Sequence, residues 1–257
     1  MEIDGKHILI TGANRGIGLA FAIECAKTKA HLILAIRKAD LQLVEKLKKQ
    51  GAASVEVIES DLSSFEGVEK LAKKMNSLKV DILFNNAGQL TGGLIESQPI
   101  AEIYQMLQVN VNALIHLSRA VIPLMLRQGA GKIINHASVS AVMHFPCAST
   151  YAASKAAVWA FTDCIEQELK GTGVSTLCLF TPGIKTRMFD EIETLYAKNI
   201  DVVQDSIPPE KYAQMIVEAI KNDEVYLEPN GATGMAFRVA QHFKGIFNWG
   251  VSQKFKR

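Results

Sequence analysis

The sequence YAASK, at residues 151 to 155, places a tyrosine and a lysine four positions apart in a run of small residues. On a helix, residues i and i+4 share one face, so the Lys155 ammonium would lie beside the Tyr151 ring. A free tyrosine has a pKa near ~10, and a neighbouring cation stabilises its phenolate. These five residues alone fit both a proton-transfer pair and an ordinary pair on a helix surface.

A second pattern with chemical meaning follows the apolar run HILI (7–10), where TGANRGIG (11–18) leads into a helical pattern. Glycines let the backbone turn tightly and approach a pyrophosphate, and the start of the next helix offers unpaired N–H groups and a partial positive charge. Strand, glycine loop and helix in this order indicate a dinucleotide site rather than a plain turn. We expect it to use Gly12, Asn14, Arg15, Gly16, Ile17 and Gly18.

The elements that would position these groups are short apolar runs alternating with longer helical patterns. This alternation predicts an α/β fold, a doubly wound Rossmann-type sheet of about seven mostly parallel strands with helices on both faces. The expected strands are 7–10, 31–36, 54–60, 81–87, 132–138, 174–180 and 225–228, and the expected helices are roughly 16–28, 39–50, 64–76, 99–128, 150–170 and 208–221. The long stretch 181–207 is expected to be irregular and to form a functional loop such as a lid.

Composition places limits on the function. Hydrophobic residues make up 48% and charged residues 21% of the 257 residues, which is typical of a globular chain with a substantial core. The net charge of +2 is too small to favour nucleic acid. Four scattered cysteines, without a CxxC pair or a Cys/His cluster, favour no metal site. The N-terminus does not look like a signal peptide and no apolar run approaches ~20 residues, so we expect a cytoplasmic protein.

Four patterns occur in order along the chain: TGxxxGxG at 11–18, NNAG at 85–88, Ser138, and Tyr151-x3-Lys155 thirteen residues after the serine. Together they resemble the short-chain dehydrogenase/reductase family, over nearly the whole chain up to about residue 228. We therefore expect a single Rossmann-type domain at 1–228 and an extension at 229–257. The resemblance implies an NADP(H)- or NAD(H)-dependent oxidoreductase that interconverts a carbonyl and an alcohol, usually as a homodimer or homotetramer.

The resemblance also implies four catalytic roles. Tyr151 protonates the carbonyl oxygen as hydride arrives, or deprotonates the alcohol in reverse, and Lys155 also holds the nicotinamide ribose. Ser138 hydrogen-bonds the same substrate oxygen. Asn110, in QVNVNA, helps to hold a water that links Lys155 to solvent; Asn112 is the alternative, but the spacing from NNAG favours Asn110.

The choice of cofactor depends on the end of the second expected strand. An acid there hydrogen-bonds the adenosine ribose, whereas an arginine accommodates a 2′-phosphate. Ile36 stands where NAD-preferring relatives have the acid, Arg37 follows it and Arg15 adds a second cation, so NADP(H) is favoured over NAD(H). Alternatively, Arg37 and Lys38 only cap a solvated helix start. The resemblance further assigns to the cofactor Asp61, Leu62, Asn86, Ala87, Gly88, Tyr151, Lys155, Pro182, Gly183, Ile184 and Thr186.

The segment between Ser138 and Tyr151, together with the loop after the sixth strand, would form the substrate pocket. Its apolar residues predict a lipid, steroid or retinoid type of substrate held by Ser138, Val142, Phe145, Tyr151, Met188 and Phe189. Lys185 and Arg187 leave open a 3-oxoacyl reductase with a carrier-linked substrate. A non-catalytic NADP(H)-binding regulatory protein is the other alternative. His136 and His144 are predicted to be packing residues.

The extension at 229–257 has five basic residues and no acid. Apolar residues recur in it at helical spacing, with Arg238 and Lys244 outside the stripe: Met235, Val239, Phe243, Ile246 and Phe247. This pattern predicts a helix packed on its own domain or on a sister subunit. Alternatively, the extension is a basic amphipathic segment that contacts a membrane or covers a lipid-binding mouth.

Overall fold

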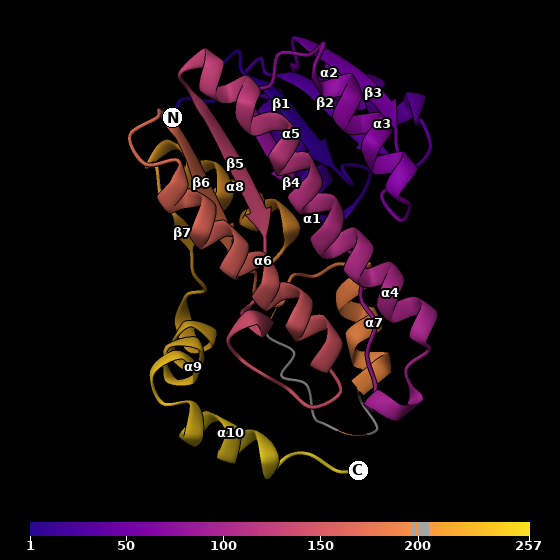
Figure 1. The fold of residues 1–257 in the computed structure, drawn as a ribbon, viewed down its shortest axis with the longest axis vertical. Coiled ribbons are helices and arrows are strands. Elements are labelled where there is room, and N and C mark those ends of the chain that lie inside the picture. Colours follow the sequence, from indigo (N-terminus) through magenta and orange to yellow (C-terminus); the bar gives the residue numbers. More distant parts are fainter. Residues whose placement is uncertain (197–198, 200–205) are drawn as a thin grey trace.

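The computed structural model describes residues 1–196, 199 and 206–257. Within them the chain forms a seven-stranded sheet in the order β3-β2-β1-β4-β5-β6-β7, and every neighbouring pair is parallel (Figure 1). The predicted doubly wound sheet is therefore confirmed. The strands are β1 His7–Thr11, β2 His31–Ile36, β3 Ser54–Glu59, β4 Ile82–Asn85, β5 Gly131–His136, β6 Val174–Leu179 and β7 Tyr226–Leu227.

Helices cover both faces of this sheet because successive strand residues point to opposite sides and both sides are apolar. In β1, for example, Ile8 and Ile10 belong to one core cluster and Leu9 to the other. The first cluster contains α1 Gly16–Ala26, α2 Leu41–Lys49 and α8 Pro209–Lys221. The second contains α3 Phe65–Met75, α5 Ala113–Gln128 and α6 Ser149–Glu168. Each face thus buries a separate hydrophobic layer.

The predicted helix at 99–128 is one helical stretch with a distortion inside it. It consists of α4 Ile100–Leu107, a π-helical segment Gln108–Asn112, and α5. This stretch is long and apolar enough to cross a membrane, but half of its apolar window is buried inside the protein. Leu117 and Val121 of α5 lie in the core cluster against the sheet. Packing against the sheet thus accounts for its apolar composition.

Two segments differ from the sequence-based prediction. The stretch 181–207, predicted to be irregular, contains α7 Arg187–Tyr196, in which Arg187 and Glu191 form an i,i+4 ion pair at 3.2 Å. Residues 197, 198 and 200–205 of this stretch lie outside the described part of the chain. The extension forms two helices rather than one, α9 Gly231–His242 and α10 Lys244–Ser252, which meet at Phe243. In Figure 1 they lie at the end of the molecule away from β2 and β3.

Candidate active site

The glycine loop lies where the strand order changes direction. β1 pairs with β2 on one side and with β4 on the other, and in such sheets ligands bind at the carboxyl ends of the strands that diverge there. Thr11 joins the two loops: its Oγ1 accepts hydrogen bonds from the backbone N–H groups of Asn86 (3.0 Å) and Ala87 (2.9 Å). The Asn86 amide in turn donates to the carbonyl oxygens of Thr11 (2.9 Å) and Gly12 (3.2 Å).

The backbone of this loop fits a pyrophosphate. Gly12 and Gly16 have φ values of +67° and +56°, which favour glycine. A Cβ on Gly18 would lie 2.4 Å from the Asn86 amide nitrogen and 2.7 Å from the Gly12 oxygen, so Gly18 permits the helix to pack against the loop. No side chain caps the N-terminus of α1 at Arg15, and its first N–H groups remain available to an anion.

A groove of about 500 Å³ runs beside this loop and brings together most residues predicted to bind the cofactor. Gly18 packs behind the loop, whereas Pro182, Gly183 and Ile184 line the neighbouring substrate cavity. The predicted residues that line the groove are Gly12, Asn14, Arg15, Gly16, Ile17, Arg37, Asp61, Leu62, Asn86, Ala87, Gly88 and Thr186.

The charges in this groove are mixed but place cations beside the end of β2. Arg15, Arg37 and Lys46 line it, and the β2 residue there is Ile36 rather than an acid. Asp61 follows β3, the strand that pairs with β2. Its carboxylate accepts hydrogen bonds from the Ser63 backbone N–H (3.0 Å) and hydroxyl (2.8 Å). These bonds, with a smaller effect of the Arg37 charge, lower the pKa of Asp61. The position at the end of β2 itself is thus apolar, with Arg37 next to it and Asp61 within the range of the Arg37 charge.

The predicted catalytic residues Ser138, Tyr151 and Lys155 meet between β5 and α6. Ser138 follows β5 and begins a short 3₁₀ turn, Val139–Ala141, in which its Oγ accepts a hydrogen bond from the Ser140 N–H at 3.2 Å. Tyr151 and Lys155 lie one turn apart on α6, with the lysine Nζ 5.6 Å from the centroid of the tyrosine ring. The Nζ also donates to the His136 carbonyl oxygen at 2.6 Å. The ammonium is thus buried but has a partner.

Burial governs the protonation of the Tyr151 and Lys155 side chains. It raises the pKa of Tyr151 to about 12, although the nearby Ser138 hydroxyl acts in the opposite direction. It also lowers the pKa of Lys155 to about 8. Desolvation is the largest influence on Tyr151, and it disfavours the charged phenolate. At pH 7 both groups carry their protons.

Asn110 lies in the π-helical segment, and its side chain is buried. Its Oδ1 accepts from the Gln89 N–H (2.8 Å), while its Nδ2 donates to the Gln89 oxygen (2.9 Å) and the Ser154 hydroxyl (3.2 Å). Asn112, the alternative, is exposed and bonds only to the Gln108 side chain among the described residues. Asn110 therefore ties the loop after β4 to α6 beside Lys155, and its amide does not contact the ammonium directly.

A second cavity, of about 640 Å³, opens in front of Ser138 and Tyr151. We call it the substrate cavity. Phe145, Met188 and Phe189 line it, as predicted, whereas Val142 is buried in a core cluster and does not line it. Lys185 and Arg187, considered for an anionic substrate, line the cofactor groove instead. The described residues around the substrate cavity include no acid.

Sequence patterns did not identify several residues at the site. His136 lines both the cofactor groove and the substrate cavity, and its Nδ1 lies 3.3 Å from the Asn86 Oδ1. Burial and the Lys155 charge lower the pKa of His136 to about 3, so the ring is neutral. The one sequence feature that could have placed His136 at the site is its position two residues before Ser138. The extension, for which covering the mouth of the pocket was one of the alternatives, supplies a wall of the substrate cavity: Ala232, Thr233, Ala236, Val239, Ile246, Phe247, Gly250, Val251 and Lys254.

Comparisons with known proteins agree with this arrangement. A family model described as short chain dehydrogenase matches residues 6–196. The chain is 30% identical over 238 residues to the ketoacyl reductase HetN of Nostoc sp. (90% of this chain, 81% of that protein). It is 28% identical over 250 residues to an uncharacterized oxidoreductase of Bacillus subtilis (94% and 87%). The structure of L-sorbose reductase from Gluconobacter frateurii, complexed with NADPH and L-sorbose, shares 25% identity at a TM-score of 0.78 (91% and 98%). The chain therefore belongs to the short-chain dehydrogenase family of oxidoreductases, which act with a nicotinamide cofactor.

Proposed function

We propose that this protein is an NADP(H)-dependent reductase of an apolar ketone or aldehyde, with Tyr151 as the general acid. The observation that carries this proposal is the substrate cavity, in which the Ser138 and Tyr151 side chains meet a largely apolar wall that includes Met143, Phe145 and Phe189. Such a cavity favours a substrate with one polar carbonyl and an apolar body.

The chain's own residues would act as follows. The Ser138 hydroxyl donates a hydrogen bond to the carbonyl oxygen and orients it toward Tyr151. Tyr151, protonated at neutral pH because burial raises its pKa to about 12, gives its proton to that oxygen as negative charge develops there. Lys155, 5.6 Å from the ring centroid, stabilises the resulting phenolate. The bound nicotinamide would supply the hydride to the carbonyl carbon.

The preference for NADP(H) rests on charge. Arg37 and Arg15 line the groove together with Ile36, so a 2′-phosphate on the adenosine ribose would meet two cations and no acid at the position of Ile36. Arginine binds phosphate with paired N–H groups. Asp61, which lines the same groove and lies within the range of the Arg37 charge, is assigned by the resemblance to the adenine.

The substrate class is supported by the same cavity. Lys254 is the one charged side chain among the described residues that line it. A lipid, steroid or retinoid type of substrate fits this wall better than a sugar, although the structural relative from Gluconobacter was solved with L-sorbose. The similarity to HetN supports a second candidate function, that of a ketoacyl reductase. In that case an anionic carrier attached to the substrate would lie near Lys254 at the mouth of the substrate cavity. A cytoplasmic location and a homodimer or homotetramer remain predictions.

A carbonyl panel tests this proposal. Purified protein is given NADPH or NADH with a long-chain ketone, a steroid ketone, retinal, a 3-oxoacyl thioester and L-sorbose, and cofactor oxidation is followed by absorbance. The proposal predicts turnover that requires NADPH and is fastest with an apolar carbonyl. Turnover restricted to sorbose contradicts the apolar substrate, and faster turnover with NADH contradicts the cofactor preference. Tight NADPH binding without any turnover supports the regulatory alternative.

A further inference from the structure

Helices α9 and α10 have one face that packs on the domain and another that faces solvent. On the inner face Phe237 and Ala240 are buried, and the Phe247 ring meets the Phe145 ring edge-on at 5.6 Å. On the outer face four large apolar side chains are exposed: Met235 (70%), Phe243 (61%), Ile246 (63%) and Trp249 (68%). The stripe predicted from sequence is therefore divided between the two faces.

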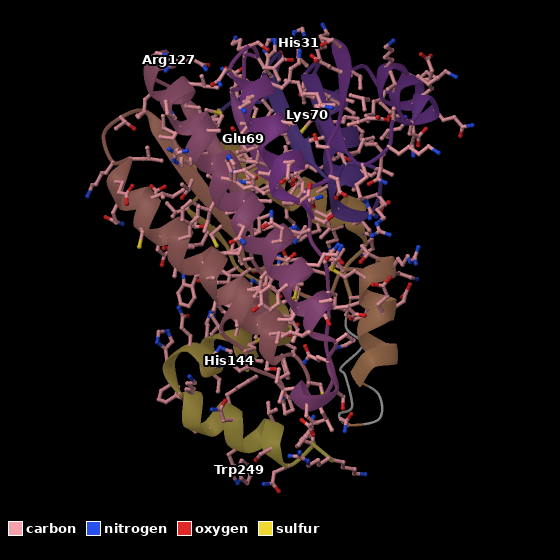
Figure 2. All side chains as sticks on the ribbon, turned by 45° about the vertical axis from the view of Figure 1, so that its right-hand side comes forward. His31, Glu69, Lys70, Arg127, His144 and Trp249 are labelled. Carbon is pink, nitrogen blue, oxygen red and sulfur yellow. The ribbon has the colours of Figure 1, made fainter. Side chains whose placement is uncertain are left out.

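Three of the exposed side chains form a row that starts at the junction of α9 and α10 and continues along α10. Phe243, Ile246 and Trp249 follow one another at intervals of three residues, which on a helix places them on adjoining parts of one side. Figure 2 shows Trp249 at the extreme end of the molecule, opposite His31. A row of large apolar side chains at one end of a protein marks a contact surface.

The charges around this row have one sign. Residues 229–257 contain five basic residues and no acid. Arg257 forms an ion pair with Glu96 at 2.8 Å. In the part of the chain that the structure describes, Arg238, Lys244, Lys254 and Lys256 have no carboxylate within ion-pair distance. Exposed aromatic and aliphatic side chains beside unpaired cations match an anionic lipid surface.

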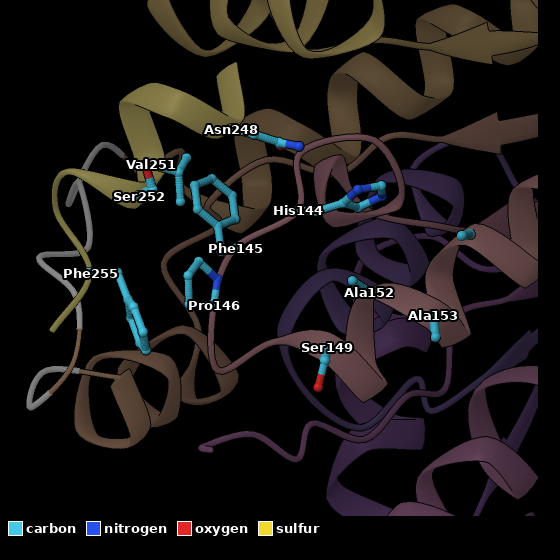
Figure 3. Close-up of a pocket in the computed structure, with 11 residues that line it drawn as sticks. His144, Phe145, Pro146, Ser149, Ala152, Ala153, Asn248, Val251, Ser252 and Phe255 are labelled. Atoms are coloured by element: carbon cyan, nitrogen blue, oxygen red, sulfur yellow. The ribbon is translucent and has the colours of Figure 1, made fainter. Parts of the chain in front are cut away.

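The same two helices separate this surface from the substrate cavity. Ile246 is exposed and also lines the substrate cavity, and Lys254 stands at its edge. A further hollow of about 530 Å³ lies between α10 and the start of α6, and Phe145 and Val251 line both hollows. Figure 3 shows Phe145 next to Val251, with Phe255 and Pro146 nearby. An apolar compound at the outer face of α10 would therefore be separated from the substrate cavity only by α10.

We propose that the outer face of α9 and α10 binds peripherally to a bilayer that contains anionic phospholipid, with Phe243, Ile246 and Trp249 inserted among the lipids. The cations on both helices face the headgroups. The binding itself does not depend on the reaction; the further step, entry of apolar substrate from the bilayer past α10, rests on the proposed function.

Tryptophan fluorescence tests the binding directly. The chain has two tryptophans, so Trp159→Phe leaves Trp249 as the only reporter. We expect its emission to shift to shorter wavelength and to be quenched by brominated lipid with vesicles of 7:3 phosphatidylcholine and phosphatidylserine, and much less with phosphatidylcholine alone. In the same background Met235→Ser with Phe243→Ser should lower the partition coefficient at least tenfold, as should Arg238→Glu with Lys244→Glu. Leu41→Ser, which removes an exposed leucine on α2, should change nothing.

The outcomes separate binding from catalysis. Reduction of a water-soluble carbonyl should be unchanged in the Met235→Ser, Phe243→Ser variant, whereas reduction of a carbonyl dissolved in anionic vesicles should fall with the partition coefficient. Absence of a Trp249 shift with either vesicle overturns the proposal even if the enzyme is active. A dimer that the Met235→Ser, Phe243→Ser variant dissociates, without vesicle binding by the parent, also overturns it and assigns the face to a second copy. Vesicle binding without turnover supports the surface and counts against the reductase.

Discussion

Replacing Gly18 by alanine should destabilise the protein, because a Cβ there has no room. It would lie 2.4 Å from the Asn86 Nδ2 and 2.7 Å from the Gly12 carbonyl oxygen, where ordinary contacts begin at 3.4 Å. Asn86 cannot retreat without losing its hydrogen bonds to the Thr11 and Gly12 carbonyl oxygens, each worth about 1 kcal/mol. Overpacking costs ~1–3 kcal/mol, and alanine recovers up to ~1 kcal/mol of helix propensity. The net loss is about 2–5 kcal/mol.

Urea unfolding followed by circular dichroism measures this loss, and Gly245→Ala is the matched control. Gly245 also lies in a helix, α10, but its added Cβ would meet no atom within 4 Å. The free energy of unfolding should therefore stay the same or rise slightly in Gly245→Ala. Because Gly12 and Asn86 line the cofactor groove, Gly18→Ala should also weaken NADPH binding. A Gly18→Ala protein within about 0.5 kcal/mol of Gly245→Ala, the usual range for neutral surface changes, would refute the packing role.

Two further predictions concern the cofactor and the pH dependence. Arg37→Asp should lower kcat/KM for NADPH roughly 10–100-fold, which corresponds to the loss of one charge-assisted hydrogen bond of about 1.5–3 kcal/mol, while kcat/KM for NADH should stay the same or rise. The control Lys38→Asp alters an exposed cation outside the groove and should change neither value. Equal effects of the two substitutions would contradict a specific contact between Arg37 and the cofactor. Because the pKa of Lys155 is lowered to about 8, the ammonium is present below that pH and lost above it. We therefore expect kcat/KM for NADPH to fall as pH rises through about 8, and a flat profile from pH 7 to 9.5 would count against the role of Lys155.

The sheet could be predicted because its strands are buried on both faces and read as nearly continuous apolar runs, such as HLILAI at 31–36. Five of the seven expected strands are close to the observed ones, while the expected strands at 81–87 and 132–138 continue past β4 and β5 into the loops that carry Asn86 and Ser138. The observed strands end earlier because Asn86 and Ser138 leave the hydrogen-bonding pattern of the sheet, which places them at the groove and at the substrate cavity. The glycine loop was predictable because its conformations require glycine at particular places.

Other features depend on tertiary structure that local patterns do not encode. The π-helical segment at Asn110 forms where the side chain is held by Gln89 and Ser154, far apart in sequence. α7 is an exception, because its amphipathic sequence and its Arg187–Glu191 i,i+4 pair are local helix signals that the prediction of an irregular 181–207 stretch did not use. The division of the Met235–Phe247 stripe between an inner and an outer face depends on the break at Phe243. The high pKa of Tyr151 comes from burial, which the spacing of YAASK does not reveal.

The most direct test of the central claim is hydride transfer with and without the Tyr151 hydroxyl. NADPH with deuterium at both C4 positions is mixed with the best apolar carbonyl, and deuterium in the alcohol is measured by mass spectrometry for the parent and for Tyr151→Phe. The account predicts deuterated alcohol from the parent and a rate lower by roughly 10²–10⁴ in the variant, the usual contribution of a general acid, with NADPH binding retained. Equal rates in the two proteins, or no deuterium in the alcohol from the parent, would contradict it.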